Sequence, residues 1–218
     1  KPPIYTVTAP SGTGKTTLNR RLAREYSNIE ISISYTTRKQ RRDEINGDHY
    51  WFVSKDEFNK QIKNGQMLEW ALVFENYYGT SLKDLDRIAK KKHTALLEID
   101  VQGWLQAKEK LKDSKSIFIL PPSISELWNR LNTRASDSPE NRMTRLQTAK
   151  EELMYVKEYD YFILNENLDS AFDELEKAFF DPNKLSLTKE EGLKHAKKLV
   201  LEFDKAQWIT KLKKKLSL

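Results

Sequence analysis

The chain has 218 residues, of which 38% are apolar and 11% aromatic, and this suits one folded domain of ordinary size. It contains no cysteine, which excludes disulfides, thiolate metal sites and a cysteine nucleophile. The lack of cysteine fits a cytoplasmic protein. No apolar run approaches the length that crosses a bilayer, so no membrane partner is expected for the body of the chain.

The surplus of positive over negative charge is confined to the C-terminal part of the chain. Lysine and arginine number 38 against 32 aspartate and glutamate residues, which gives a net charge of +6. From Pro182 onward the counts are 10 and 4, so the first 181 residues carry 28 of each sign. The body of the chain is neutral, and its charge gives no indication of a nucleic-acid partner.

The N-terminal part predicts a strand, a helix and a second strand, at residues 4–8, 15–26 and 29–34. The region 35–80 differs, because it is polar, aromatic and irregular, with turn signals at Asn46-Gly47 and Asn64-Gly65. One helix is expected in it, started by the capping-box pattern Ser54-Lys55-Asp56-Glu57. We interpret this region as a small insert that reaches over a sheet.

After the insert, helices and strands alternate regularly. Helices are expected at 82–91, 104–111, 125–134, 142–155 and 168–180, and strands at 95–99, 117–120 and 161–164. The stretch 135–141 is expected to be a connection. Strands that alternate with helices imply an α/β fold with a parallel sheet covered on both faces.

Residues 183–218 predict a basic helical C-terminal extension. Thr188-Lys189-Glu190-Glu191 can cap a helix, and apolar residues then recur at helical spacing. The simplest interpretation is one or two helices that pack on the body, and a membrane or nucleic-acid contact is the alternative. Because every motif described below precedes the extension, activity is expected to survive its removal.

Residues 11–16, Ser-Gly-Thr-Gly-Lys-Thr, complete a phosphate-binding Walker A pattern in which Ala9 replaces the first glycine. The glycines allow backbone N–H groups to turn inward around phosphates, and the following helix contributes its positive end. Lys15 can reach the β and γ phosphates, and Thr16 can offer a hydroxyl group to Mg²⁺. A glycine-rich turn with an exposed lysine is the alternative, but the position between a strand and a helix favours binding of ATP or GTP.

The insert contains a cluster of residues suited to a monophosphate. Arg38, Arg41 and Arg42 lie close together, and Tyr50, Tyr77 and Tyr78 follow. Arginine binds phosphate through two parallel hydrogen bonds, and tyrosine hydroxyls donate to the remaining oxygens. An arginine run alone is more often a solvated face. The phosphate loop elsewhere in the chain makes a phosphate site the better interpretation.

These motifs and several others, in order, resemble the guanylate kinase family from about Ile4 to Phe180. The matching segments are Ala-Pro-Ser-Gly-x-Gly-Lys at 9–15, Ser-x-Thr-Thr-Arg-x-x-Arg at 34–41, Asn-Gly-x-x-Tyr at 46–50, Glu69, Asn-Tyr-Tyr-Gly-Thr at 76–80, Ile-Asp-x-Gln-Gly at 99–103, 117–123 and 158–169. So many ordered matches are far more specific than the phosphate loop by itself.

The resemblance implies the fold of a P-loop nucleoside monophosphate kinase: a parallel sheet core flanked by helices, a mixed α/β insert that binds GMP, and a helical lid. The expected kinase domain spans 1–182, with its core at 1–33 and 82–182, its insert at 34–81 and its lid at 123–158. The implied reaction is ATP-dependent phosphorylation of GMP, and also of dGMP, with Mg²⁺ as cofactor. A monomer or homodimer is expected.

The resemblance also assigns roles to individual residues. For the GMP site it implies Ser34, Arg38, Arg41, Tyr50, Glu69, Tyr78, Thr80 and Asp100. For the ATP site it implies Ser11, Gly12, Thr13, Gly14, Lys15, Thr16, Thr17, Arg130, Arg134 and Asn165, with Thr16 also on the metal. The residues expected to act on the transferring phosphoryl group are Lys15, Arg38, Arg134 and Arg145.

The expected role of Glu69 has a physical reason. Guanine presents its N1–H and N2–H₂ donors side by side, and a carboxylate accepts both, whereas adenine has no donor at N1. A buried site built on such hydrogen bonds can reject the wrong base by roughly 10⁴-fold.

Some positions depart from the family pattern. Glu98 stands where aspartate is usual, Gln40 where proline is common, and Ala135 where glycine commonly follows Arg134. Two alternatives stay open: a kinase for another nucleoside monophosphate, and a catalytically inactive module that binds phosphopeptides. The intact phosphate loop favours an enzyme over the binding module.

Overall fold

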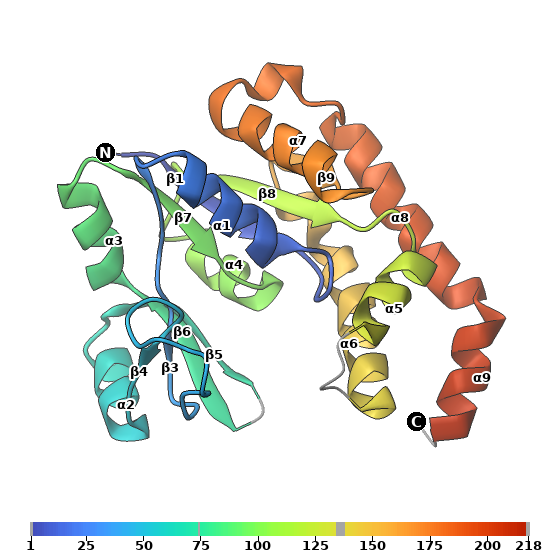
Figure 1. The fold of residues 1–218 in the computed structure, drawn as a ribbon, viewed down its shortest axis with the longest axis horizontal. Coiled ribbons are helices and arrows are strands. Elements are labelled where there is room, and N and C mark those ends of the chain that lie inside the picture. The colour runs from blue at the N-terminus through green and yellow to red at the C-terminus, as the bar shows by residue number, and fades with distance from the viewer. Residues whose placement is uncertain (1, 74, 134–137, 217–218) are drawn as a thin grey trace. The chain divides into compact units, whose positions relative to one another are not determined.

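The computed structural model describes residues 2–73, 75–133 and 138–216, and these form two compact units (Figure 1). Unit 1 comprises Lys1–Thr6 and Leu22–Lys115, and unit 2 comprises Val7–Arg21 and Ser116–Leu218. The main sheet has the strand order β2-β7-β1-β8-β9. The pairs β2–β7 and β8–β9 are parallel, which confirms the predicted α/β fold with a parallel sheet.

Unit 1 contains part of the main sheet and the whole predicted insert. Its elements are β1 (Ile4–Thr8, shared with unit 2), the end of α1 (Lys15–Glu25), β2 (Ile29–Ile31), β3 (Tyr35–Thr36), β4 (Trp51–Phe52), α2 (Lys55–Lys63), β5 (Met67–Val73), β6 (Asn76–Ser81), α3 (Leu82–Lys90), β7 (Thr94–Glu98) and α4 (Val101–Ala107). In β7, Ala95–Leu97 are all buried, as is typical of a strand covered on both faces.

The insert is built on a second, four-stranded sheet of order β4-β3-β6-β5. The strands β5 and β6 form an antiparallel hairpin in which Glu69 is paired with Thr80. Helix α2 begins where predicted, because the side chain of Ser54 accepts a hydrogen bond from the backbone N–H of Glu57. The fully buried ring of Phe58 in this helix stacks on Tyr77 of β6, with ring centroids 5.2 Å apart. This contact holds α2 on the second sheet.

The strand predicted at 29–34 is shorter than expected. It ends at Ile31 because the chain is then bound by Asp84 of α3. The Asp84 carboxylate accepts hydrogen bonds from the Ser32 hydroxyl at 2.9 Å and from the Ile33 backbone at 2.8 Å. The chain leaves the main sheet here and enters β3 of the second sheet, so Ser34 lies at the junction of the two sheets.

Helix α4 begins three residues earlier than the prediction of 104–111. Asp100 is its N-cap, and the carboxylate accepts a 2.7 Å hydrogen bond from the backbone of Gly103. An aspartate cap is a local signal that apolar spacing alone does not reveal. It places Asp100 at the end of β7, where α4 begins.

Unit 2 contains the phosphate loop, the predicted lid and the C-terminal extension. Its elements after α1 are β8 (Lys115–Leu120, from Ser116 on), α5 (Ile124–Asn132), α6 (Pro139–Glu152), the short 3₁₀ helix η1 (Leu153–Glu158), β9 (Tyr161–Leu164), α7 (Leu168–Phe180), η2 (Pro182–Lys184), α8 (Lys189–Lys205) and α9 (Gln207–Leu216). Its core includes the fully buried residues Ile117–Leu120 of β8, Phe162 of β9 and Phe172 of α7.

The connection predicted at 135–141 is partly wrong. Helix α6 begins at Pro139, because the hydroxyl of Ser138 caps it and proline suits its first turn. Residues 135–137 lie outside the described residues. At its other end α6 passes directly into η1, so the predicted helix 142–155 is extended at its start and tightened at its end.

The extension folds as two helices that pack within unit 2 (Figure 1). Thr188 and Glu191 form a complete capping box at the start of α8. A methyl group on Gly192 would collide with the ring of Phe162, so α8 packs directly on β9. Among the described helices, none is long and apolar enough to cross a membrane.

Candidate active site

The phosphate loop connects β1 with α1 through two glycines in the left-handed region. Gly12 has a φ of +90° and Gly14 a φ of +92°, which other residues rarely adopt. The backbone N–H of Thr13 donates to the carbonyl of Pro10 at 3.1 Å. The loop therefore has the tight turn that a phosphate cradle at a helix N-terminus requires.

Asn165, at the end of β9, supports this loop through a hydrogen bond. Its side-chain Nδ2 donates to the carbonyl of Thr13 at 2.6 Å, and its own backbone N–H donates to Leu120 of β8. A methyl group on Gly14 would lie 2.9 Å from that Nδ2 atom. Asn165 is only 1% exposed, so the structure gives it a supporting contact with the loop. Its predicted contact with adenine stays a prediction.

Two of the three predicted lid arginines lie close to the same loop. Nη1 of Arg145, on α6, donates to the hydroxyl of Ser11 at 3.0 Å. Arg130, on α5, forms an ion pair with Glu126 at 2.9 Å and donates to the carbonyl of Asn165 at 3.1 Å. Arg134 lies outside the described residues. Unit 2 thus brings Ser11, Arg130, Arg145 and Asn165 together from four segments of the chain.

The residues after the loop occupy the first turn of α1. Lys15 is half-buried, and Thr16 and Thr17 are exposed. No group of three His, Asp or Glu residues in the described ranges could hold a metal by itself. Mg²⁺ usually takes one or two protein ligands and completes its coordination with phosphate oxygens and water. The role of Thr16 as such a ligand stays a prediction.

The second set of predicted residues surrounds a cavity of about 230 Å³ in unit 1. Five of the eight predicted GMP-site residues line it: Ser34, Tyr50, Glu69, Tyr78 and Asp100. Thr80 is buried opposite Glu69 on the neighbouring strand. Glu98, one of the positions expected to depart from the family pattern, lines the same cavity. Strands β5, β6 and β7, the start of α4 and the residues just before β3 and β4 therefore bring these side chains together.

Glu69 is a buried carboxyl group, with 6% of its surface exposed. Burial raises its pKa to about 7, and the charge of Asp100 acts in the same direction, whereas a hydrogen bond with Thr80 opposes the shift. A carboxyl group in this state gains from two well-placed donors, because they stabilise its charged form. The cavity is thus prepared for a ligand that donates hydrogen bonds.

Arg38 and Arg41 lie on the loop that follows β3, and the Arg38 side chain is held firmly. Glu44 forms a two-bond ion pair with Arg38, at 2.7 and 2.9 Å. The rings of Tyr50 and Phe52 each lie 5.6 Å from its guanidinium carbon. The Glu44 carboxylate raises the pKa of Arg38, and Tyr78 adds to this. Arg38 is therefore a fixed cation beside the tyrosines of the cavity, whereas Arg41 is exposed.

The protein-family model described as guanylate kinase matches residues 2–182 of this chain. The chain belongs to the guanylate kinase family. A guanylate kinase from Lactococcus lactis is 43% identical over 174 residues, which cover 80% of this chain and 85% of the relative. One from Clostridium perfringens is 41% identical over 173 residues, covering 79% and 80%. The crystal structure of a guanylate kinase from Anaplasma phagocytophilum is 33% identical, with a TM-score of 0.65, and covers 86% of this chain and 88% of that one.

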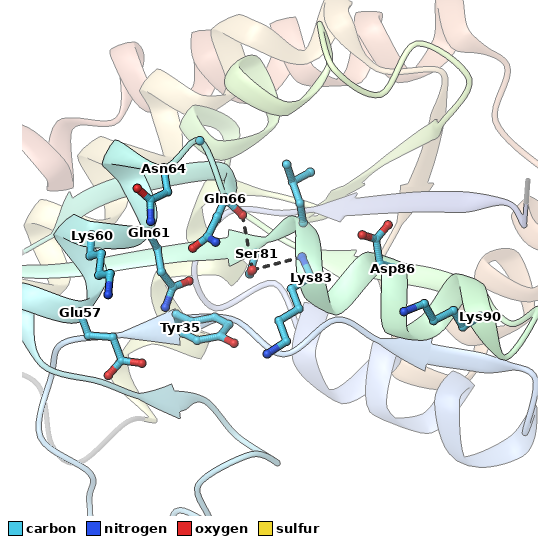
Figure 2. Close-up of a pocket in the computed structure, with 12 residues that line it drawn as sticks. Tyr35, Glu57, Lys60, Gln61, Asn64, Gln66, Ser81, Lys83, Asp86 and Lys90 are labelled. Carbon is cyan, nitrogen blue, oxygen red and sulfur yellow. Dashed lines mark hydrogen bonds between the residues drawn. The ribbon is translucent and has the colours of Figure 1, made fainter.

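This guanylate kinase has a second and larger cavity in unit 1, of about 670 Å³, which contains none of the predicted site residues. Figure 2 shows α2 and α3 presenting polar side chains on the two sides of Tyr35. Within the described residues, no ion pair joins the lysines and carboxylates of these two helices across the cavity. At this point α2 of the insert and α3 of the core are separated by a polar cleft.

Two residues that contact predicted site residues carry no predicted role of their own. Glu44 carries no role in the predicted set, although a carboxylate three residues after Arg41 is itself a signal of internal pairing. Gly103 was recognised only as part of a motif. In the structure a methyl group at Gly103 would lie 2.8 Å from Oε2 of Glu69, so its lack of a side chain makes room for the buried carboxylate.

Proposed function

We propose that this guanylate kinase binds GMP in the cavity around Glu69 and ATP at the phosphate loop, and transfers the γ-phosphoryl group between them. The family membership supplies the reaction, ATP-dependent phosphorylation of GMP. The observation that carries the residue-level proposal is the buried carboxyl group of Glu69 in a cavity lined by Ser34, Tyr50, Tyr78 and Asp100.

In the proposed GMP site, the Glu69 carboxylate accepts the N1–H and N2–H₂ groups of guanine. Ser34 and Thr80 complete the hydrogen bonds to guanine, and Asp100 helps to orient the nucleotide. Arg38, Arg41, Tyr50 and Tyr78 bind the phosphate, through charge-assisted bonds from the guanidinium groups and hydroxyl donors. As the resemblance to the family implies, dGMP is included among the substrates.

In the proposed ATP site, the backbone of residues 11–17 and the ammonium group of Lys15 surround the phosphates. Arg130, Arg134 and Arg145 bind the ATP phosphates from the lid, and Asn165 holds the loop in place. Mg²⁺ would be held by the Thr16 hydroxyl and the phosphates, and when bound it neutralises part of their charge.

The attacking group is a phosphate oxygen of GMP, which is largely deprotonated near neutral pH, so no general base is needed. Catalysis then consists of alignment and of charge stabilisation by Lys15, Arg38, Arg134 and Arg145. Arginine and lysine keep their charge throughout the reaction. The chain thereby stabilises the negative charge that spreads over the transferring group.

A coupled assay of ADP formation tests this proposal. The protein is mixed with MgATP and, separately, with GMP, dGMP, AMP, CMP and UMP. Rapid turnover is expected with GMP and dGMP, and turnover with the other nucleotides should be lower by orders of magnitude. Better activity on another monophosphate would reject the guanine site. No activity on any of them, with GMP still bound, would instead identify a binding module.

A further inference from the structure

We propose that Glu44 is a positioning residue for the phosphate of GMP: it fixes the guanidinium of Arg38 so that one particular edge of that group is presented to the ligand. The inference rests on the proposed function, because it takes Arg38 as a phosphate ligand. It adds a residue, and a reason for its charge, that the reaction chemistry by itself does not require.

The contacts of Glu44 are short and converge on the loop after β3 that contains Arg38 and Arg41. Its Oε1 accepts from Nη2 of Arg38 at 2.7 Å, and its Oε2 accepts from Nη1 at 2.9 Å. Oε2 also accepts from the backbone N–H of Arg41 at 2.8 Å. The amide of Gln40 donates to the Glu44 carbonyl at 2.6 Å. One carboxylate thus orients both predicted phosphate arginines, the first through its side chain and the second through its backbone.

Burial makes this arrangement rigid. The side chains of Arg38 and Glu44 are 17% and 13% exposed, far less than in an ordinary surface ion pair. The hydrogen bond from Arg38 lowers the pKa of Glu44 to about 2, and the backbone of Arg41 contributes. Glu44 is therefore charged over the whole range in which an enzyme works, and its hold on Arg38 does not vary with pH there.

The donors of Arg38 show which edge remains for a ligand. A guanidinium group has five N–H bonds. Nη1 uses both of its own, one on Glu44 and one on the carbonyl of Lys39 at 2.8 Å, and Nη2 uses one on Glu44. Glu44 and Lys39 do not use the Nε–H and the second Nη2–H, which together form the other fork of the group. This is the geometry that meets two oxygens of a phosphate. Arg38 also makes a side-chain hydrogen bond with Tyr78.

The neighbours of Arg38 fit the same direction. Tyr78, which lines the acceptor cavity, acts with Glu44 to raise the pKa of Arg38. Tyr50, also in that lining, packs its ring against Tyr78 with centroids 5.9 Å apart. Glu44 and Lys39 occupy one edge of the guanidinium, so a phosphate beside the two tyrosines would meet the other fork and share Arg38 with Tyr78.

A positioning role and a competing role give opposite results. If Glu44 only competed with phosphate for Arg38, its removal would strengthen GMP binding. If it positions Arg38, its removal weakens binding of GMP but leaves guanosine, which has no phosphate, unaffected. A merely structural role would weaken both ligands alike.

The experiment compares Glu44→Gln with Asp43→Asn, measuring the dissociation constants of GMP and guanosine by calorimetry and kcat and KM for GMP. Asp43 is an exposed neighbour for which the described residues provide no hydrogen bond or ion pair, so it loses the same charge without losing contacts. For Glu44→Gln we expect about ten- to a hundredfold weaker GMP binding and a matching rise in KM, with a smaller change in kcat. The affinity of Glu44→Gln for guanosine should change less than about twofold. In Asp43→Asn, the affinities for GMP and for guanosine should both change less than about twofold.

A double-mutant cycle with Arg38→Ala then tests the mechanism. In a protein that already carries Arg38→Ala, adding Glu44→Gln should weaken GMP binding by less than about a further threefold. A full further loss there, tighter GMP binding, or an equal loss for guanosine would each overturn the proposal. If Arg38→Ala itself leaves the difference between GMP and guanosine unchanged, the phosphate site proposed above is wrong. Should Glu44→Gln fail to fold, Glu44→Asp, which keeps the charge but shortens its reach, is expected to weaken GMP selectively.

Discussion

Gly103 and Glu69 approach each other so closely that the position cannot carry a side chain without displacing the carboxylate. A methyl group added at Gly103 would lie 2.8 Å from Oε2 and 3.1 Å from Cδ of Glu69. It would also lie 3.3 Å from Oδ1 of Asp100, which accepts from the Gly103 backbone. One residue of α4 therefore sets the space available to both carboxylates of the acceptor cavity.

Gly103→Ala should weaken GMP use without affecting ATP binding. Overpacking of this kind costs about 1–3 kcal/mol, so kcat/KM for GMP is expected to fall by roughly five- to 150-fold. Steady-state kinetics at saturating ATP measures the fall. Gln102→Ala, an exposed change on the same helical turn, is the control and should behave as the parent protein. Unchanged kinetics in Gly103→Ala would mean that the position of Glu69 does not limit GMP binding.

Glu69→Gln tests the proposed recognition of guanine directly. The variant keeps the shape of the side chain but faces the two guanine donors with one oxygen and an NH₂ group. An unmet buried donor costs about 1–3 kcal/mol, and more where a charged partner is lost. We expect kcat/KM for GMP to fall roughly ten- to several-hundredfold. The measurement is kcat/KM for GMP and for AMP, in the variant and in the parent protein. Full retention of the preference for GMP over AMP would show that Glu69 does not read the base.

The raised pKa of Glu69 predicts a pH dependence of nucleoside binding. Only the carboxylate accepts both guanine donors, so binding favours the deprotonated form of a group whose pKa is about 7 in the free protein. Affinity should therefore rise with pH and level off above pH 7, by about tenfold between pH 6 and 8. Guanosine is the ligand to use, because a phosphate group titrates near pH 6 itself.

The matched control for this pH dependence is Glu69→Gln, which has no carboxyl group at this position. Its guanosine affinity should be weak and flat over the same range. A slope that persists in Glu69→Gln would have to come from another group in the cavity, and it would contradict the assignment.

The C-terminal extension is expected to matter for stability. Glu202 of α8 accepts hydrogen bonds from the backbone N–H groups of Ile124 and Ser125, the first turn of α5, at 3.0 and 3.1 Å. His195 contacts the carbonyl of Pro121 at 3.0 Å. Glu202→Ala should cost about 1–2 kcal/mol, and lower Tm by roughly 2–8 °C. Thermal melting measures the change in Tm. The control is Glu190→Gln, a change at an exposed position of the same helix, which should leave Tm unchanged.

Removal of the chain from Lys184 onward tests the same packing more severely. The sequence by itself suggests that the extension is dispensable, since every motif precedes it. The close packing of α8 on β9 and its cap on α5 lead us to expect a truncated protein that unfolds or aggregates near room temperature. A truncated protein that stays folded and fully active would restore the expectation from the sequence.

The sequence by itself determined the features that depend on near neighbours. The glycines and lysine of the phosphate loop, the serine cap of α2, and the continuous apolar runs of β7 and β8 are all local patterns. Their spacing selects a backbone conformation whatever the rest of the chain does. Even here a local signal was overlooked, because the carboxylate of Asp100 starts α4 earlier than its apolar spacing predicts.

Only the tertiary structure decided which distant residues meet. Asn165 binds the carbonyl of Thr13 across 152 positions of the sequence, and Glu202 caps α5 across 78. Gly103 makes room for Glu69 from a different element of unit 1. Such contacts follow from how helices and strands pack against one another, and no periodicity within one segment encodes them. The same packing buries Glu69, and burial, which a sequence pattern does not measure, is what raises its pKa.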